Sequence, residues 1–256
     1  MTAVDLLEGV HVAVDDRGIA TVTFAHPQSN CLPGEVLSSL ASEITTLGGR
    51  PDVKVLVLKS AGNRAFCAGA SFDELIAISD EAEGLKFFSG FAGVINALRT
   101  IPQLVIGRVQ GKAVGGGVGV ASAVDFCMAT QHAAVKLSEL AVGIGPFVVG
   151  PAVERKMGRS AMSTLAIDAT AWKSASWACD HGLYAEVFDN VEAMDAAVDA
   201  LAGRLAKSNP EAMAELKRTF WSGTEHWGEL LLERAQVSGR LVLSDFTRKA
   251  ILGFKS

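Results

Sequence analysis

The sequence predicts an α/β fold, in which strands alternate with helices as far as about residue 190. Short runs rich in β-branched and apolar residues at 19–24, 53–58 and 104–109 have the length of strands. Segments with apolar residues at helical spacing follow these runs. Two of the strand-to-helix turns are rich in glycine and alanine. Strands joined through helices favour a parallel sheet with right-handed crossovers.

The first third of the chain predicts a hairpin, a helix and a strand. Residues 10–14 and 19–24 are the hairpin strands, and the Asp-Asp-Arg-Gly turn at 15–18 separates them. Residues 35–47 place apolar side chains on one helical face, and the two glycines at 48–49 end that helix. The run 53–58 is short, mainly apolar and flanked by turn signals, so we expect a strand buried on both faces.

Two glycine-rich turns follow strands in the same way. The strand at 53–58 leads into Ala-Phe-Cys-Ala-Gly-Ala at 65–70 and a helix from about Ser71. The strand at 104–109 leads into a turn that ends with three glycines at 115–117, and then into an apolar helix to about Val124. A third, shorter passage predicts strands near 126–129 and 134–137, a loop at 139–147 and a helix around 149–157.

Beyond about residue 190 the pattern becomes helical. Residues 191–207 and 211–221 are amphipathic, and 225–253 contains no convincing strand. We therefore expect a core formed by residues 1–190 and a helical C-terminal region formed by residues 191–256. Two explanations remain open for its aromatic residues, a subunit contact or core packing. These residues are Trp221, Trp227, Phe246 and Phe254.

Composition excludes several classes of function. The net charge of −5 over 256 residues offers no large positive field for a nucleic-acid backbone. No run approaches 18 apolar residues, and acidic residues precede the first basic one, so neither a membrane span nor a secretory signal is indicated. The four cysteines are scattered and the five histidines form no ligand pair, so we expect no disulfide framework and no metal site. We expect a soluble, cytoplasmic protein.

The two glycine-rich turns are the candidate ligand-binding elements of the sequence. Each exposes backbone N–H groups at the positive end of a helix, and glycine at 115–117 lets a ligand atom approach closely. Two such turns that converge would form an oxyanion hole. Neither a phosphate-binding loop nor a dinucleotide fingerprint fits, because Lys112 precedes the glycines and Val120 stands where a third glycine is needed. Alternatively, the glycines only let a helix pack closely on a strand.

The two turns together resemble the enoyl-CoA hydratase/isomerase (crotonase) superfamily. The first turn is followed by Asp73-Glu74, and the Gly-x-Ala-x-Gly-Gly-Gly run at 111–117 is followed by Asp125. The resemblance covers about residues 10–190. It implies a spiral (superhelix) of ββα repeats with a helical C-terminal trimerisation region, assembled as a homotrimer or a dimer of trimers. It also implies an acyl-CoA thioester substrate and no cofactor beyond the CoA of that substrate.

The resemblance implies a site. The backbone N–H groups of Ala70 and Gly116 would hold the oxygen of a thioester enolate, and Glu139 would be the catalytic carboxylate. Leucine, valine and isoleucine flank Glu139, which favours a raised pKa. The segment 66–71 would line the CoA path. The residues expected to bind the substrate are Phe66, Ala68, Gly69, Ser71, Gly115, Gly117 and Phe147.

One departure from the family pattern bears on the reaction. Two-glutamate hydratases carry their first glutamate where this chain has Gly119, whereas the second falls on Glu139. One carboxylate is enough to carry a proton from C2 to C4, as in single-glutamate Δ3,Δ2-enoyl-CoA isomerases, and hydration usually employs two. The resemblance therefore implies an enzyme that hydrates an enoyl-CoA, or shifts its double bond, in fatty-acid or branched-chain acyl-CoA degradation, with a Δ3,Δ2-enoyl-CoA isomerase that uses only Glu139 as the alternative. A non-catalytic acyl-CoA-binding homologue is the further alternative.

Other positions also differ from relatives. Phe147 stands where aryl-CoA dehalogenases of the family carry their nucleophilic Asp, so that reaction is disfavoured, and Val148 and Val149 are candidate acyl-chain contacts. His26 and Gln28 replace residues that are often basic and contact the CoA phosphates. Lys112 or Lys255 is a candidate replacement for that contact. The carboxylates at 73–74 are expected to be solvated, with a supporting catalytic role as the alternative.

Overall fold

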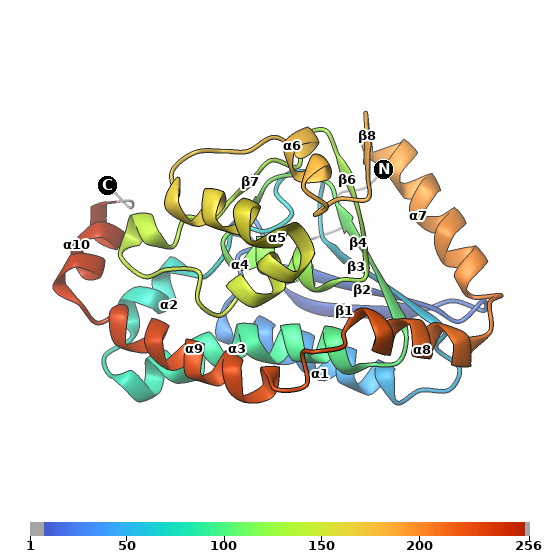
Figure 1. Ribbon diagram of the computed structural model, residues 1–256, viewed down its shortest axis with the longest axis horizontal. Coiled ribbons are helices and arrows are strands. Elements are labelled where there is room, and N and C mark those ends of the chain that lie inside the picture. The colour runs from blue at the N-terminus through green and yellow to red at the C-terminus, as the bar shows by residue number, and fades with distance from the viewer. Residues whose placement is uncertain (1–7, 254–256) are drawn as a thin grey trace.

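The main sheet of the protein has six strands. The computed structural model describes residues 8–253 (Figure 1), and the strand order is β1-β2-β3-β4-β6-β8. The pair β1–β2 is antiparallel, and each later neighbour is parallel. The predicted α/β class and the predicted hairpin are therefore confirmed. The strands of this sheet are β1 (Gly9–Val14), β2 (Ile19–Ala25), β3 (Val55–Ser60), β4 (Leu104–Val109), β6 (Phe126–Thr130) and β8 (Glu186–Phe188).

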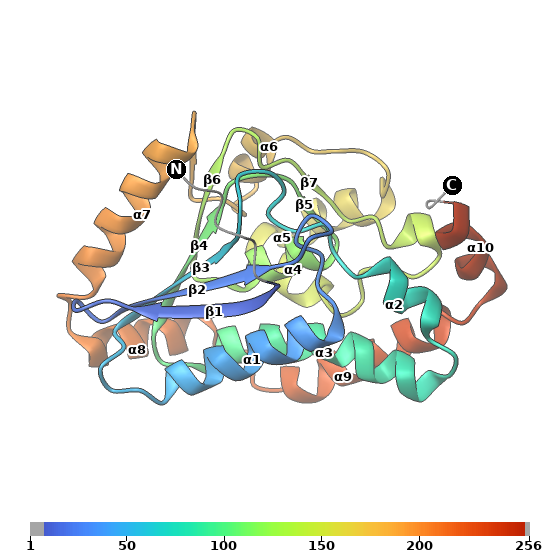
Figure 2. The same cartoon turned by 180° about the vertical axis from the view of Figure 1, so that it is seen from behind.

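Alternation along the strands divides the apolar side chains between two faces of this sheet. Leu56 and Leu58 of β3 belong to the larger core, whereas Val55 and Val57 of the same strand belong to a smaller one. The larger core is covered by α1 (Gly34–Gly48) and α3 (Glu81–Thr100). The smaller core is covered by α7 (Val191–Leu205), which Figures 1 and 2 show across the sheet from the other helices. The strand at 55–60 is thus buried on both faces, as its sequence predicts.

A second, two-stranded sheet lies at the carboxyl end of the main one. The strands β5 (Ala113–Val114) and β7 (Val135–Lys136) are parallel and pair Ala113 with Val135 and Val114 with Lys136. Bridges join this sheet to the first glycine-rich turn, because Cys67 pairs with Ala113. The small sheet therefore brings both turns to one place.

The remaining elements position the surroundings of these turns. The connections between the strands contain the other helices of the core. These are α2 (Phe72–Ala77), α4 (Gly116–Ala123), the short 3-10 helix η1 (Leu140–Val142), α5 (Gly150–Ile167) and α6 (Ala175–Asp180). The sequence patterns did not predict α3 as a separate long helix, nor α6 and β8. Helix α5 extends beyond the predicted 149–157, and Gly158, at φ +81°, breaks its regular path.

The C-terminal region is helical, as predicted. It consists of α7, α8 (Pro210–Phe220), α9 (Trp227–Leu241) and α10 (Asp245–Gly253). Trp221 and Trp227 are buried and pack edge to face, which makes them core residues, whereas Phe246 is exposed. Phe254 and Lys255 lie outside the described residues. Within residues 8–253 no helix combines the length and apolar character needed to cross a membrane.

Helix α9 packs closely along α3. A Cβ added at Gly84 of α3 would lie 2.7 Å from Cα of Gly239 in α9, so the two backbones touch at this point. Figure 2 shows α9 running beside α3 on the side of the sheet that α1 also covers. This contact places Ser238 of α9 at the cavity described below.

Candidate active site

The two glycine-rich turns lie side by side. The amide of Val114 donates to the carbonyl of Cys67 at 2.9 Å, and the amide of Gly115 donates to the carbonyl of Lys136 at 2.8 Å. On its other side, the first turn accepts a hydrogen bond of 2.8 Å from Leu32 N–H at the Gly69 carbonyl. A Cβ built on Gly69 would lie 3.9 Å from the nitrogen of Gly116. The ends of the two turns therefore meet.

Two backbone N–H groups at this meeting point are unpaired. Gly116 begins α4, so its N–H has no acceptor within the helix. Within the described part of the chain, neither this N–H nor that of Ala70 makes a hydrogen bond. Both residues line the same cavity. At the positive end of a helix, such a pair can donate to one anionic or carbonyl oxygen.

The three consecutive glycines are each required by a close contact. A Cβ at Gly116 would lie 2.1 Å from Cε1 of Phe91, and one at Gly117 would lie 2.6 Å from Cβ of Cys67. Gly115 has a φ of +51°, and a Cβ there would lie 2.9 Å from Oε1 of Glu139. Close packing thus accounts for the second and third glycines. The first one gives space to a carboxylate.

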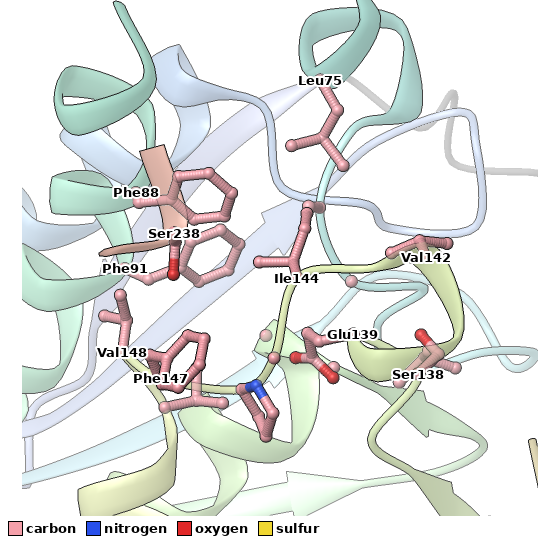
Figure 3. Close-up of a pocket in the computed structure, with 18 of the residues that line it drawn as sticks. Leu75, Phe88, Phe91, Ser138, Glu139, Val142, Ile144, Phe147, Val148 and Ser238 are labelled. Carbon is pink, nitrogen blue, oxygen red and sulfur yellow. The ribbon is translucent and has the colours of Figure 1, made fainter. Parts of the chain in front are cut away.

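Glu139 follows β7 and immediately precedes η1, and its side chain lines the cavity. Its carbonyl accepts hydrogen bonds from Val142 N–H at 3.2 Å and Ile144 N–H at 3.0 Å, which fix the loop. The Oε2 atom is buried and has no hydrogen-bond partner among residues 8–253. Burial raises the pKa of Glu139 to about 7. Figure 3 shows this side chain among Val142, Ile144 and Phe147. The carboxylate is thus poised to exchange a proton near neutral pH.

The rest of the cavity wall is mainly apolar. The cavity has a volume of about 60 Å³, and the side chains around it come from α2, α3, α9 and the loop before α5. Its polar side chains are Glu139, Ser138 and Ser238. Such a wall suits an acyl chain and strengthens electrostatic interactions with a reacting carbonyl. The large apolar side chains are Phe72, Leu75, Phe88, Phe91, Val114, Val142, Ile144, Phe147, Val148 and Val149.

The position of the absent second glutamate is closed. A Cβ on Gly119 would lie 2.4 Å from Cγ1 and 2.5 Å from Cβ of Val149. Both distances are far below normal van der Waals contact. Val149 itself lines the cavity. Position 119 therefore carries no carboxylate and has no room for one while Val149 is present.

The residues predicted from sequence to bind the substrate fall into two groups. Those that line the cavity are Ala68, Gly69, Gly115 and Phe147, together with the predicted catalytic residues Ala70, Gly116 and Glu139. The other three lie outside its lining. Phe66 packs edge to face on Phe24 in the core, Ser71 caps α2 by accepting from Glu74 N–H, and Gly117 packs on Cys67.

Sequence patterns missed the part of the wall that α2, α3 and α9 supply. Phe88 and Phe91 recur on one face of α3, a spacing that is equally typical of a core helix. Ser238 is distant in sequence and reaches the cavity only through the packing of α9 on α3. No local signal identifies these residues, since tertiary contacts alone bring them to the turns.

The region around His26 and Gln28 carries acidic groups. His26 Nε2 lies 3.0 Å from Oε1 of Glu8, and Gln28 donates to Oδ2 of Asp73 at 3.0 Å. Glu74 accepts from Gly34 N–H at 2.7 Å at the start of α1, so it is a structural partner of that helix. These residues surround a surface cavity of about 600 Å³ that also contains Glu35. No lysine or arginine is among the described residues that line it.

Comparisons with known proteins agree with this geometry. The family model "Enoyl-CoA hydratase/isomerase" matches residues 15–249. A putative enoyl-CoA hydratase/isomerase of Bacillus subtilis is 31% identical over 142 residues, which cover 54% of each chain. The chain thus spans about half the length of this curated relative. Carnitinyl-CoA dehydratase of Salmonella enteritidis is 28% identical over 81% of this chain and 78% of the relative.

A solved structure shows the same fold over nearly the whole chain. The crystal structure of an enoyl-CoA hydratase from Bacillus halodurans matches with a TM-score of 0.87 and 18% identity, and the match covers 95% of this chain and 99% of that one. The predicted crotonase-type architecture is therefore confirmed. Since the family model matches most of the chain, the protein belongs to the enoyl-CoA hydratase/isomerase family.

Proposed function

We propose that this protein is an acyl-CoA enzyme that shifts the double bond of a 3-enoyl thioester to the 2-position, with Glu139 as its only proton-transferring carboxylate. One observation carries this proposal. The buried, unpartnered Oε2 of Glu139 lies in the same cavity as two unpaired amides, and Val149 fills the space beside Gly119. One carboxylate suffices for a proton shift within a single substrate.

The first step uses the two turns. The thioester carbonyl oxygen accepts hydrogen bonds from the N–H groups of Ala70 and Gly116, and the Glu139 carboxylate takes a proton from C2. The electron pair of the broken C–H bond is delocalised toward the carbonyl oxygen, where the amides stabilise the negative charge. Each donor of this kind contributes about 10²–10³ in rate.

The second step returns the same proton. Protonated Glu139 donates it to C4, and the electrons of the dienolate move the double bond between C2 and C3. Glu139 is again a carboxylate, and no water or cofactor is consumed. A pKa of about 7 allows the side chain to be a base in one step and an acid in the next.

Hydration of a 2-enoyl thioester is the competing reaction, because the family includes both activities. It requires Glu139 to activate a water at C3 without a second carboxylate to position that water or donate a proton. The apolar wall formed by Phe147, Val148 and Val149 offers no replacement. These features favour isomerisation.

The assay measures both reactions on the same protein. We expect 3-hexenoyl-CoA to be converted to 2-hexenoyl-CoA faster than crotonyl-CoA is hydrated. Glu139→Gln should lower isomerisation by about 10²–10⁴-fold, whereas Glu233→Gln, an exposed change on α9, should leave it unaltered. Faster hydration than isomerisation would contradict the proposed reaction. Binding of acyl-CoA without turnover of either substrate would favour the non-catalytic alternative.

We also propose assembly as a trimer or dimer of trimers, as the family resemblance implies. Large apolar side chains on the C-terminal region support an interface there, since Phe220, Phe246 and Leu252 are all more than half exposed in the single chain. Light scattering of the purified protein tests this expectation. A monomeric mass would contradict it.

A further inference from the structure

Two lysines meet on one exposed indole ring. The Nζ atoms of Lys112 and Lys136 each lie 4.7 Å from the ring centroid of Trp172. Their two ammonium groups are therefore no more than twice that distance apart. Trp172 is 41% exposed, although it takes part in both contacts. We call these three residues the lysine–tryptophan cluster.

The positive charges of this cluster are not neutralised by the protein. Among residues 8–253, neither lysine forms an ion pair or a hydrogen bond through its ammonium group. Lys173, the neighbour of Trp172, is paired with Asp168 at 3.0 Å. The indole ring attracts both ammonium groups but supplies no negative charge to neutralise them. An anion would complete this arrangement.

The cluster lies at the edge of the candidate active site. Val114 and Lys136 are register partners in the small β5–β7 sheet, so their side chains share one face of it. Val114 lines the Glu139 cavity. Lys112 precedes Val114 by two residues, which places it on the same side of the extended chain. The two lysines therefore lie on the same face of the small sheet as Val114, which lines the cavity.

The other flank of the site is unsuited to an anion. The surface cavity beside α1 and α2 carries Glu8, Glu35, Asp73 and Glu74, and no lysine or arginine is among its described lining residues. Phosphate groups placed there would face carboxylates at short range. The lysine–tryptophan cluster combines unpaired positive charge with continuity to the cavity.

We propose that the lysine–tryptophan cluster binds phosphate groups of the thioester carrier while the acyl end occupies the Glu139 cavity. This inference rests on the proposed function, because it assigns the non-reacting end of the same substrate. Lysine ammonium groups bind phosphate oxygens as point charges. Contacts to this end stabilise the bound substrate and the transition state equally, so they lower KM without raising kcat.

The first test measures binding without turnover. We expect the Lys112→Ala/Lys136→Ala double variant, in a Glu139→Gln background, to bind CoA about tenfold more weakly than Glu139→Gln alone in equilibrium titrations at low salt. Pantetheine, which has no phosphate, should bind both proteins equally. Lys54→Ala/Lys207→Ala removes two exposed lysines elsewhere and should have no effect. Equal CoA affinity in all three proteins would overturn the proposal.

Two further measurements separate folding from binding and one phosphate source from another. Lys112→Arg/Lys136→Arg should restore most of the CoA affinity, since charge is retained. If loss of the lysines weakens the binding of CoA but not of 4′-phosphopantetheine, the site binds the phosphates of the nucleotide part. If the lysines contribute equally to the affinity for 4′-phosphopantetheine, the site binds the phosphate attached directly to pantetheine. Failure of the arginine variant to recover affinity, in a folded protein, would contradict a phosphate site.

The turnover arm distinguishes this inference from the proposed function. With an otherwise unchanged protein, Lys112→Ala/Lys136→Ala should raise KM for an enoyl-CoA about tenfold at constant kcat, and should not change kcat/KM for the matching pantetheine thioester. If the double variant turns over enoyl-CoA with an unaltered KM, the phosphate-site proposal is wrong and the isomerase proposal stands. If CoA binding depends on the lysines but the parent protein turns over neither substrate, the phosphate-site proposal stands and the isomerase proposal is wrong.

Discussion

Val149 occupies the space next to Gly119 that a side chain at position 119 would need. The distance of 2.4 Å from a Cβ at 119 to Cγ1 of Val149 makes the two positions interdependent. The valine also forms part of the wall of the cavity that contains Glu139. An apolar side chain thus fills the space beside position 119, and Glu139 is the carboxylate among the described residues that line the cavity.

The contact between positions 119 and 149 predicts that substitutions there have non-additive effects on the free energy of unfolding. Gly119→Glu alone should destabilise the protein by about 1–3 kcal/mol, because the new side chain overpacks the contact with α5. Gly119→Glu/Val149→Gly should recover part of that loss and increase crotonyl-CoA hydration relative to the parent protein. Urea unfolding and the hydration assay measure the two effects. Additive free energies would contradict direct contact between the positions.

The pKa of Glu139 predicts the pH dependence of activity. The carboxylate must be ionised to remove a proton from C2, and burial raises its pKa to about 7. We expect kcat/KM for isomerisation to rise with pH through an apparent pKa near 7 and then reach a plateau. A profile that is already flat above pH 5 would show that the base has an ordinary carboxyl pKa.

The same shift predicts how stability depends on pH. The pKa of Glu139 is higher in the folded protein than its ordinary value of 4.5, so the folded state binds this proton more tightly than the unfolded state. Its contribution to stability is present below pH 4.5 and is lost as pH rises to about 7. Glu139→Gln should therefore increase the free energy of unfolding by about 3 kcal/mol more at pH 8 than at pH 4.

Denaturant titrations of both proteins at the two pH values test this. Exposed Glu233→Gln on α9 is the matched control and should shift stability equally at both. A pH-independent difference between Glu139→Gln and the parent would contradict a raised pKa in the folded state.

Substitution of Gly115 by alanine should lower activity, whereas the same substitution at Gly228 in α9 should not. Alanine there would place its Cβ 2.9 Å from Oε1 of Glu139 at a φ of +51°. We expect Gly115→Ala to lower kcat by about 10²-fold or more, because displacement of either the carboxylate or the Gly116 amide disrupts catalysis. Gly228→Ala, with no atom within 4 Å of the new Cβ, should retain full activity. Equal rates in both variants would contradict the tight approach.

Asp125 links the core to the C-terminal region. Its carboxylate accepts from Trp221 Nε1 at 2.8 Å and from Val105 N–H at 2.8 Å, and it forms a buried ion pair with Lys217 at 3.0 Å. Asp125→Ala should cost about 3–5 kcal/mol in unfolding free energy, since Lys217 would be left buried and unpaired. The exposed Asp52→Ala should change the denaturation midpoint little.

Local sequence signals predicted the parts of the fold that short segments determine. The hairpin, the strand buried on both faces and both glycine-rich turns follow from periodicity and turn chemistry. The resemblance to the enoyl-CoA hydratase/isomerase family implied Glu139 as the catalytic carboxylate, and the structure places it in one cavity with Ala70 and Gly116.

The rest depended on packing between distant segments. Phe88, Phe91 and Ser238 reach the cavity because α3 and α9 pack together beside the turns, and their spacing alone is typical of ordinary core residues. The close approach of Val149 to Gly119 cannot be seen in the sequence, and neither can the contacts of Lys112 and Lys136 with Trp172.

A crystal structure of Glu139→Gln with a bound 3-enoyl-CoA tests the central claim most directly. The account predicts the thioester carbonyl oxygen about 3 Å from the nitrogens of both Ala70 and Gly116, with the side chain at 139 against C2 and C4. A carbonyl oxygen that contacts neither amide, in a complex whose acyl chain occupies the cavity, would contradict it.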